Sequence, residues 1–425
     1  MDLQAPARPP WTAMASLLLG ALGVSTTFGM LLLLPLYVQE LGGDEAAFGR
    51  VASAGTVTAA LAIGALIRRP DRLPGHVVSA LAVAVYALAA LAVGTVGTYG
   101  PLIPLGVLLG TAWALVYTSM PMVMSSMVGD AERAAYFGYL TGTQQIGIGL
   151  GPVLGRQLLE AGLGFRQVFL VGGLVCLAAA ALTLWTGRLA SRSLRRRARG
   201  EERPELATAL RKIVSSDTAP MLVMIILFAC LFATMTFFQT TFARARGLDF
   251  SIFYVSYTVS VIVSRVVIAT LARGRDQALV IAVSVSVMAI GLASFLSVGS
   301  SPFVYAGASA MLGLGYGLAL PTVQAHAVNV SKEDLRPRVL PLAGLVFMTA
   351  ILGFPILAGA LISAFGYGTL FSVLLGFAGV QALIAWSRLG AGRRVLADTA
   401  REREETASSP HGSGRSSGRP STRSP

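Results

Sequence analysis

The chain alternates long apolar runs with short polar stretches, and this alternation predicts membrane-spanning helices. A bilayer core of about 30 Å needs roughly twenty apolar residues in a helix. Runs of this length begin near Thr12, Ala46, Val77, Pro101, Ala134 and Arg166, and then near Ala219, Asp249, Ala278, Pro302, Arg338 and Tyr367. Because lipid cannot satisfy open backbone groups, each run is expected to be helical. The pattern therefore predicts an all-α polytopic membrane protein with twelve transmembrane helices.

Polar segments divide these runs into two sets of six. A basic stretch separates the sixth run from the seventh, and the end of the chain is rich in Arg, Ser, Gly and Pro. Such a tail lacks the apolar content to fold. The predicted organisation is a cytoplasmic N-terminus (1–11), a six-helix bundle (12–189), a basic cytoplasmic linker (190–217), a second six-helix bundle (218–389) and a disordered cytoplasmic tail (390–425).

Composition supports a membrane protein and explains the excess of positive charge. Hydrophobic residues make up 54% of the chain, charged residues only 12%, and the mean hydropathy is +0.70. With both termini on one side, the polar segments of that side hold 27 of the 33 Lys and Arg residues, and those of the other side hold 5. Because positive residues favour cytoplasmic loops, both termini are expected in the cytoplasm and the chain in the inner (plasma) membrane. The net charge of +13 then reflects arginines that face anionic headgroups, and no nucleic-acid partner is expected.

The two halves of the chain resemble each other. The segment that begins at Gly110 aligns with the one that begins at Gly313, so that Pro121 pairs with Pro321. A second echo lies one helix pair earlier, where GALIRRPD in the first half matches ATLARGRD in the second. Internal repeats of this kind are typical of transporters built from two related bundles.

Glycines and one proline in the fifth predicted helix carry the most specific motif. Its members are Gly138, Gly147, Gly151, Pro152 and Gly155. Their spacing resembles the fifth-helix motif of antiporters in the major facilitator superfamily, except that Arg156 replaces the final glycine. The resemblance covers nearly all of residues 12–389 and implies a monomeric carrier of two pseudo-symmetric bundles around a central cavity. Glycines allow close helix approach and proline allows a bend, so this helix is expected to shape the junction between the bundles; simple packing is the alternative.

The loop after the second helix departs from the family pattern in both halves. Where the family has an acid, this chain has Arg68, followed by Asp71, and the second half repeats the change with Arg273 and Asp276. Because both halves share it, we expect the two acids to cap or to pair with arginines at the cytoplasmic gate and to latch the outward-facing or inward-facing state. The alternative is that both are solvated loop residues.

One charged residue lies well inside a predicted membrane helix. Arg265 lies about 10 Å from the cytoplasmic end of the eighth helix, and charges at such depth are functional candidates. Three interpretations stay open: gate pairing with Asp276 or helix-end carbonyls, contact with an anion or the substrate, and snorkelling to the interface. No Asp or Glu lies in the middle of a run, which leaves His326 as the candidate proton site, although packed histidines are commoner.

The resemblance implies a substrate pocket near the midplane, and several polar or aromatic residues fall on the helices that would line it. These pocket candidates are Thr27, Trp113, Tyr117, Gln144, Gln145, Phe238, Gln239, Tyr257, Tyr316 and Gln324. Taken singly, each aromatic is more often a packing residue. The set is neutral, aromatic and rich in Gln, which suits a moderately apolar or uncharged solute.

These features favour a transporter over an enzyme. The chain has three His and lacks the sequence motifs of metallohydrolases, serine hydrolases and P-loop proteins, so no cofactor or metal site is expected. The preferred interpretation is a proton-coupled exporter of a small organic molecule that works by alternating access. Import of a small nutrient such as a sugar or organic acid is the alternative, and a non-transporting membrane sensor or scaffold is a minor one.

Overall fold

The computed structural model is helical throughout the part of the chain that it describes. The described residues are 11–68, 74–129, 132–194, 218–271, 275–331 and 335–408. Within them, ten segments are long and apolar enough to cross a membrane. One of these, Val339–Leu389, is broken at Gly366, where φ is 81°, and therefore forms two spans. With α7 (Arg133–Glu160), which is long but more polar, the segments form the twelve spans that the sequence predicts.

The first six spans come from eight helices. The first and second spans each consist of two helices in series. The bounds are α1 (Trp11–Leu31), α2 (Leu34–Glu40), α3 (Glu45–Ser53), α4 (Thr56–Arg68), α5 (Gly75–Thr95), α6 (Leu102–Met127), α7 (Arg133–Glu160) and α8 (Phe165–Leu194).

The second six spans repeat this plan. A π-helical turn, η1, interrupts the eighth span. The bounds are α10 (Ala219–Phe237), α11 (Gln239–Ala245), α12 (Phe250–Val263), η1 (Ser264–Ile268), α13 (Ala269–Leu271), α14 (Gln277–Ser294), the 3₁₀ turn η2 (Phe295–Ser297), α15 (Pro302–Asn329) and α16 (Arg336–Ser408).

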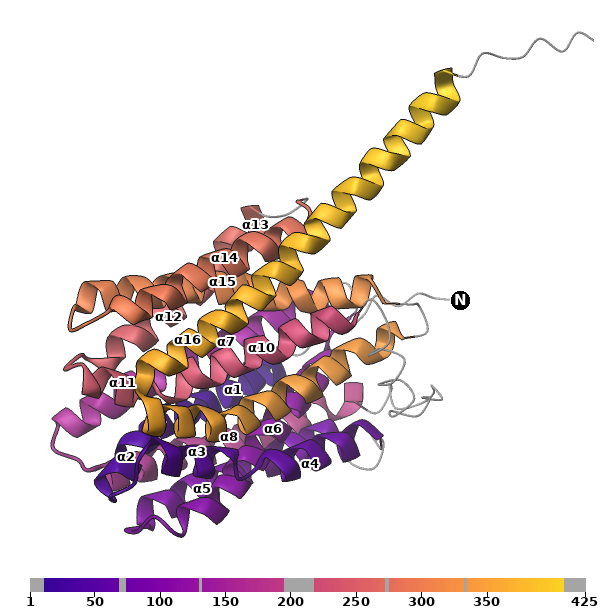
Figure 1. The fold of residues 1–425 in the computed structure, drawn as a ribbon. Coiled ribbons are helices and arrows are strands. Elements are labelled where there is room, and N and C mark those ends of the chain that lie inside the picture. Colours follow the sequence, from indigo (N-terminus) through magenta and orange to yellow (C-terminus); the bar gives the residue numbers. More distant parts are fainter. Residues whose placement is uncertain are drawn as a thin grey trace, which may run out of the picture.

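The helices pack as two bundles. In the first, α1 lies against α7 and α8, and α5 against α6 and α8. In the second, α15 lies against α12 and α14, and α10 against α16. Figure 1 shows α4, α5 and α8 on one side of the molecule and α12, α14 and α15 on the other. The predicted fold of two six-helix bundles is confirmed.

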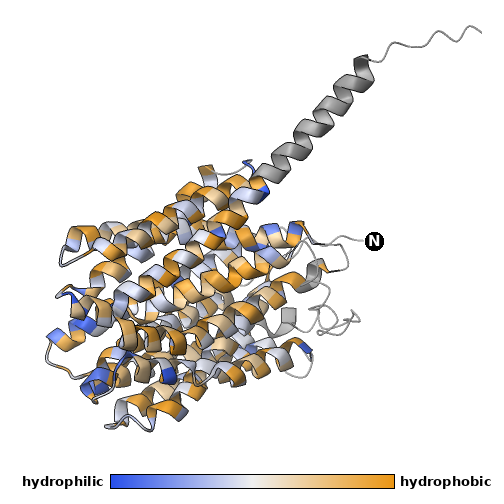
Figure 2. Cartoon of the chain, in the orientation of Figure 1, coloured by the Kyte–Doolittle hydropathy of each residue, from blue (hydrophilic) through white to orange (hydrophobic). Residues whose placement is uncertain are grey.

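The molecule has two distinct ends, which we call the turn end and the linker end. The turn end carries the short turns from α2 to α3 and from α11 to α12; the linker end carries the start of α1 and the last residues of α8 (Figure 1). Hydrophilic residues gather toward both ends, with a hydrophobic band between them (Figure 2). The expectation that the linker end is cytoplasmic stays a prediction.

Polar contacts join the two bundles at the turn end. Arg156, near the end of α7, forms an ion pair with Asp249, which precedes α12. Ser53 of α3 accepts a hydrogen bond from the backbone N–H of Ile356 at 2.9 Å. The Tyr367 hydroxyl lies 2.9 Å from a carboxylate oxygen of Glu45 in the first bundle. The residue that departs from the family's fifth-helix motif, Arg156, is thus part of the junction.

The bundles separate toward the linker end. At the turn end, a Cβ atom on Gly49 would overlap the carbonyl of Pro355 in the other bundle. A groove of about 560 Å³ then lies between α4, α10 and α16, with Ala60, Leu61 and Ile226 on its walls. Nearer the linker end, an added Cβ would meet nothing within 4 Å at Gly64, Gly138, Gly142 and Gly344.

Three of the four motif glycines of α7 correct one sequence expectation, because they contact the first span inside their own bundle. A Cβ on Gly147 would lie 2.7 Å from Ser25 Cβ, and one on Gly151 would overlap Gly29. A Cβ on Gly155 would overlap the side chain of Leu33, which also belongs to the first bundle. The glycine of α7 that meets the other bundle is Gly149, which lies against Thr258 and does not belong to the motif.

The end of the chain corrects a second expectation. α16 continues to Ser408, past the boundary at residue 390 where the sequence predicts disorder. Residues 391–408 are rich in Ala, Arg and Glu, which favour helix even without packing. The N-terminal segment 1–10, most of the linker (195–217), residues 409–425, Asp71 and Arg273 lie outside the described residues.

The close contact of α1 with α7 makes a prediction about stability. Gly151→Ala would place a methyl group on Gly29, and overpacking of this kind costs about 1–3 kcal/mol. We expect a clear fall in the thermal unfolding midpoint of the detergent-solubilised protein. The matched control is Gly138→Ala on the same helix, which adds a methyl group in open space and should leave the midpoint unchanged or slightly higher. Equal effects of the two substitutions would contradict the packing described.

The ion pair at the turn end makes a second prediction. Arg156→Gln removes an attraction between side chains that are 37% and 30% exposed, so the expected effect is about 0.5–1 kcal/mol, or roughly a two- to fivefold shift toward opening of the turn end. The readout is a cysteine that replaces Ala52 in a background that lacks Cys176 and Cys230. With Arg156→Gln, this cysteine should react with a thiol reagent roughly two- to fivefold faster than it does with Arg156 in place.

Two further variants test whether the ion pair is the cause. Exchanging the charges, Arg156→Asp with Asp249→Arg, should restore slow labelling. Arg166→Gln is the control, because Arg166 also lies at the turn end but donates to the carbonyls of Gly94 and Thr95 in its own bundle. Faster labelling in the control as well would refute a specific role for the pair.

Candidate functional site

The predicted pocket residues lie on both bundles. Thr27 is on α1, Trp113 and Tyr117 on α6, and Gln144 and Gln145 on α7. In the second bundle, Phe238 and Gln239 lie where α10 meets α11, Tyr257 is on α12, and Tyr316 and Gln324 are on α15. Trp113 and Phe238 belong to an aromatic layer nearer the turn end. Tyr117, Tyr257 and Tyr316 lie near Arg265.

The aromatic layer closes the space between the bundles. Phe28 stacks on Trp113 with ring centroids 4.1 Å apart, and it also contacts Phe237 of the second bundle at 5.9 Å. Phe48 meets Phe238 edge-on at 5.3 Å. Burial of large rings from both halves excludes water from this level.

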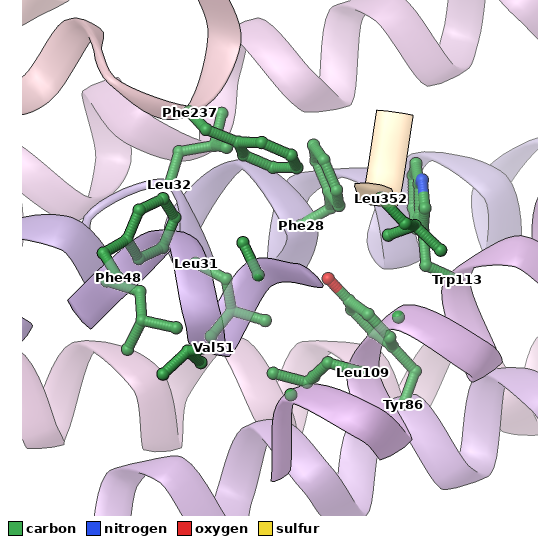
Figure 3. A pocket seen from close by; sticks show the side chains of 14 residues that line it. Phe28, Leu31, Leu32, Phe48, Val51, Tyr86, Leu109, Trp113, Phe237 and Leu352 are labelled. Carbon is green, nitrogen blue, oxygen red and sulfur yellow. The ribbon is translucent and has the colours of Figure 1, made fainter. Parts of the chain in front are cut away.

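A small apolar pocket remains within this layer (Figure 3). Its free space is about 60 Å³, roughly that of two water molecules, so it cannot hold an organic solute in this conformation. In Figure 3 the Tyr86 hydroxyl points into it, toward Leu31. Tyr86 lies on α5, the third span, which holds none of the pocket candidates predicted from the sequence. Phe28 and Phe237, which are apolar neighbours of Thr27 and Phe238, were also missed.

Thr27 and Gln239 make bonds within their own bundles. The Thr27 hydroxyl donates to the carbonyl of Gly172 at 2.7 Å. The Tyr305 hydroxyl donates to Gln239 Oε1 at 2.9 Å, and Gln239 is almost fully buried. Both side chains therefore hold neighbouring helices together in this conformation.

The paired glutamines of α7 differ from each other. Gln145 reaches across to the second bundle, where its Nε2 lies 3.5 Å from Thr258 Oγ1. Gln144 is 5% exposed, and its Nε2 has no hydrogen-bond partner among the described residues. The hydroxyl of Ser25, on α1, is a second buried polar group without a partner there. Buried amides are normally satisfied, so Gln144 is a candidate to bind a solute or water.

Arg265 lies in the π-helical turn η1 of the eighth span. Its Nε donates to the carbonyl of Gly317 on α15 at 3.4 Å. Two predicted aromatics, Tyr257 and Tyr316, lie near Arg265. The centroids of these two rings are 6.2 Å from each other. From the first bundle comes Tyr117, whose ring lies 6.3 Å from Phe347 of the second bundle. Within the part of the chain that the structure describes, this group brings charged and aromatic candidates from both bundles near each other.

Of the two roles expected of Asp276, capping and pairing with an arginine, the structure shows the first. Asp276 accepts a hydrogen bond from the backbone N–H of Ala278 at 2.9 Å and so caps α14. It forms no ion pair with Arg265 in this conformation, so the pairing of these two residues is not observed. Arg68 is the exposed last residue of α4, and its expected partner Asp71 lies outside the described residues.

His326 is half-buried near the linker end of α15. Its Nδ1 lies 3.3 Å from Gln277 Oε1, and Asn329 donates to the same oxygen at 3.1 Å. Gln324, two residues earlier, is also half-buried. The histidine is therefore anchored to α14 within the second bundle, away from the Arg265 group by several turns of helix.

Comparison with known proteins agrees with this architecture. The family model described as "Major Facilitator Superfamily" matches residues 3–149 and 78–350. A gallate transporter of Pseudomonas putida is 31% identical over 181 residues, which are 42% of this chain and 39% of that protein. The alignment thus spans about two fifths of that relative's length.

Two solved structures share the fold. The nucleoside transporter NupG superposes with a TM-score of 0.68 at 16% identity, over 89% of this chain and 98% of NupG. The human organic anion transporter MFSD10 superposes with a TM-score of 0.62 at 13% identity, over 89% of this chain and all of MFSD10. The matched family model covers most of the chain, and the two-bundle fold is that of these transporters: the protein belongs to the major facilitator superfamily.

Proposed function

We propose that this protein is a proton-coupled exporter that moves a small organic molecule across the inner membrane by alternating access. The observation that carries the proposal is the asymmetry of the junction. The bundles are joined at the turn end by Arg156 and Asp249 and separate toward the linker end, where Gly138 and Gly344 meet open space. A solute could then reach the Arg265 group from one end only.

Rocking of the two bundles would exchange the open end. The turn-end contacts are one ion pair, a few hydrogen bonds and close glycine packing, as between Gly49 and Pro355. Each is individually weak, so together they can hold one state without locking it. The bundles themselves are held by extensive helix packing and would move as rigid units.

Export is supported by the resemblance of the α7 motif to that of antiporters. If the linker end is cytoplasmic, as the arginine distribution predicts, the present conformation is open to the cytoplasm and would load its solute there. The carrier would act as a monomer with both termini inside. Proton coupling needs a group that titrates near neutral pH, and His326 is the candidate.

Import is a second candidate. The similarity to a gallate transporter favours an organic acid as the solute in that case. The names of these relatives give gallate, nucleosides and organic anions as solutes, all small organic molecules, and none of them states a direction.

Transport itself is tested with purified protein in liposomes. We expect at least one of gallate, 4-hydroxybenzoate, uridine and glucose to cross several-fold faster than in protein-free liposomes. Acidifying the compartment that faces the turn end should accelerate movement toward it, and a protonophore should abolish the acceleration. Flux without any response to the pH gradient would refute coupling. No flux of any solute would favour a sensor or scaffold.

The buried amide of α7 gives a sharper test of the site. Gln144→Ala should lower the rate of transport about tenfold, because a hydrogen bond to a buried solute is lost. Gln381→Ala is the matched control: Gln381 is also buried and has an unpartnered oxygen, but its amide donates to Met224 within the second bundle. Equal losses in both variants would point to folding rather than to the site.

His326 is tested by uncoupling. His326→Gln keeps a hydrogen-bonding side chain opposite Gln277 but cannot carry a proton. We expect exchange of solute between the two sides to continue while acceleration by the pH gradient is lost. If the gradient still drives the variant as it drives the native protein, His326 is not the coupling group.

A further inference from the structure

Arg265 is a cation inside the membrane without an anionic partner among the described residues. It lies about 9 Å from the end of its span at Leu271, at 1.5 Å per residue. A guanidinium has five N–H donors, and the one hydrogen bond that it makes here is the long one to Gly317. Asp276, the nearest acid in sequence, is used as a helix cap. An unpaired charge at this depth raises the free energy of the protein, so binding of an anion next to Arg265 would be favourable.

The backbone around Arg265 is fixed by close helix packing. A Cβ on Gly313 would lie 2.5 Å from the carbonyl of Tyr257, and one on Gly317 would lie 3.0 Å from Ser264 Cβ. The Ser264 hydroxyl also donates to the carbonyl of Leu314 at 2.8 Å. The π-helical turn adds a residue at this point, which redirects the side chains that follow. The guanidinium is therefore held on a rigid frame, as a binding group requires.

Three phenols, from both bundles, lie near the charge. Tyr257 and Tyr316 come from the second bundle, where Tyr316 also stacks on Phe232 at 5.5 Å. Tyr117 comes from the first bundle, and the charge of Arg265 acts electrostatically on all three phenols. Arg265 follows Thr258 by seven residues and so lies on the side of the Gln145–Thr258 contact where the bundles separate. A solute that enters from the linker end would therefore meet a cation framed by aromatic rings.

We infer that the transported solute is a small organic anion with an aromatic ring, whose single carboxylate is held by Arg265 while Tyr117 and Tyr316 contact its ring. This inference rests on the proposed transport function and names its substrate class. A carboxylate matches the fork of the guanidinium with two parallel hydrogen bonds. The rings would stack on the solute, and their hydroxyls can bond its polar substituents. The inferred charge departs from the uncharged solute that the sequence favours.

The inference is tested by comparing acids with their amides. Thermal unfolding of the purified protein in detergent is followed with gallate or 4-hydroxybenzoate, and with the neutral amides of the same two acids. In the native protein we expect an acid to raise the midpoint and to bind roughly 10- to 100-fold more tightly than its amide, as the loss of a charged hydrogen bond implies. Acids that bind no better than their amides would overturn the inference.

Substitution of Arg265 shows whether the preference comes from this residue. Arg265→Gln should abolish the preference for the acid while leaving the weak binding of the amide unchanged, and Arg265→Lys should retain part of it. Arg246→Gln, which removes an exposed arginine at the turn end, should leave the preference intact. Retention of the acid preference by Arg265→Gln would overturn the inference. If that variant does not fold, the acid and amide comparison in the native protein still decides the charge of the solute.

The two proposals fail in distinguishable ways. If liposomes that contain the protein move uridine or glucose but no acid, transport stands and the anion inference falls. If the acids stabilise the protein with the expected dependence on Arg265 but no solute crosses the liposome membrane, the binding site stands and the transport proposal falls.

Discussion

Close backbone packing through glycine is the constraint on which this structure depends. In lipid, helices gain nothing from burying apolar side chains against each other, so association relies on close contact and on a few polar bonds. The contact of Gly151 with Gly29 joins α7 to α1, and Gly313 and Gly317 bring α15 against α12 and η1. These contacts make each bundle a rigid unit. They also fix Arg265 in space, because Gly317 supplies both the close approach and the carbonyl that accepts from its guanidinium.

The junction between the bundles is built differently from their interiors. Its contacts combine one partly exposed ion pair, single hydrogen bonds such as that to Ser53, and backbone contact at Gly49 and Gly149. Weak contacts at one end and open space at the other are what a carrier with two states needs, since neither state can be strongly preferred. A bound solute that neutralises Arg265 would lower the cost of closing water out of the cavity, which links occupancy to movement.

Much of the fold could be predicted from hydrophobic pattern alone, because membrane thickness fixes helix length and lipid forces backbone bonds inside each span. The predicted start near Ala134 lies one residue from the observed start of α7, although that helix is the most polar of the series. The tail was harder to predict, since residues before Ser408 have helix-forming composition but no apolar face that the pattern could detect.

The candidate site could be predicted only in part. The sequence identified Arg265, Tyr117, Tyr257 and Tyr316 one by one, because a charged or aromatic residue inside an apolar run is apparent from the amino-acid sequence. It could not show that they lie near each other, that Thr27 and Gln239 are used within their own bundles, or that three of the motif glycines face the first span. Those facts depend on the rotation of each helix about its axis and on which neighbour it meets. The sequence by itself therefore determined the spans, the twofold repeat and the rare intramembrane charge. The tertiary structure decided which side chains face each other across the two bundles, because packing between helices, and not the pattern within one, sets their orientation.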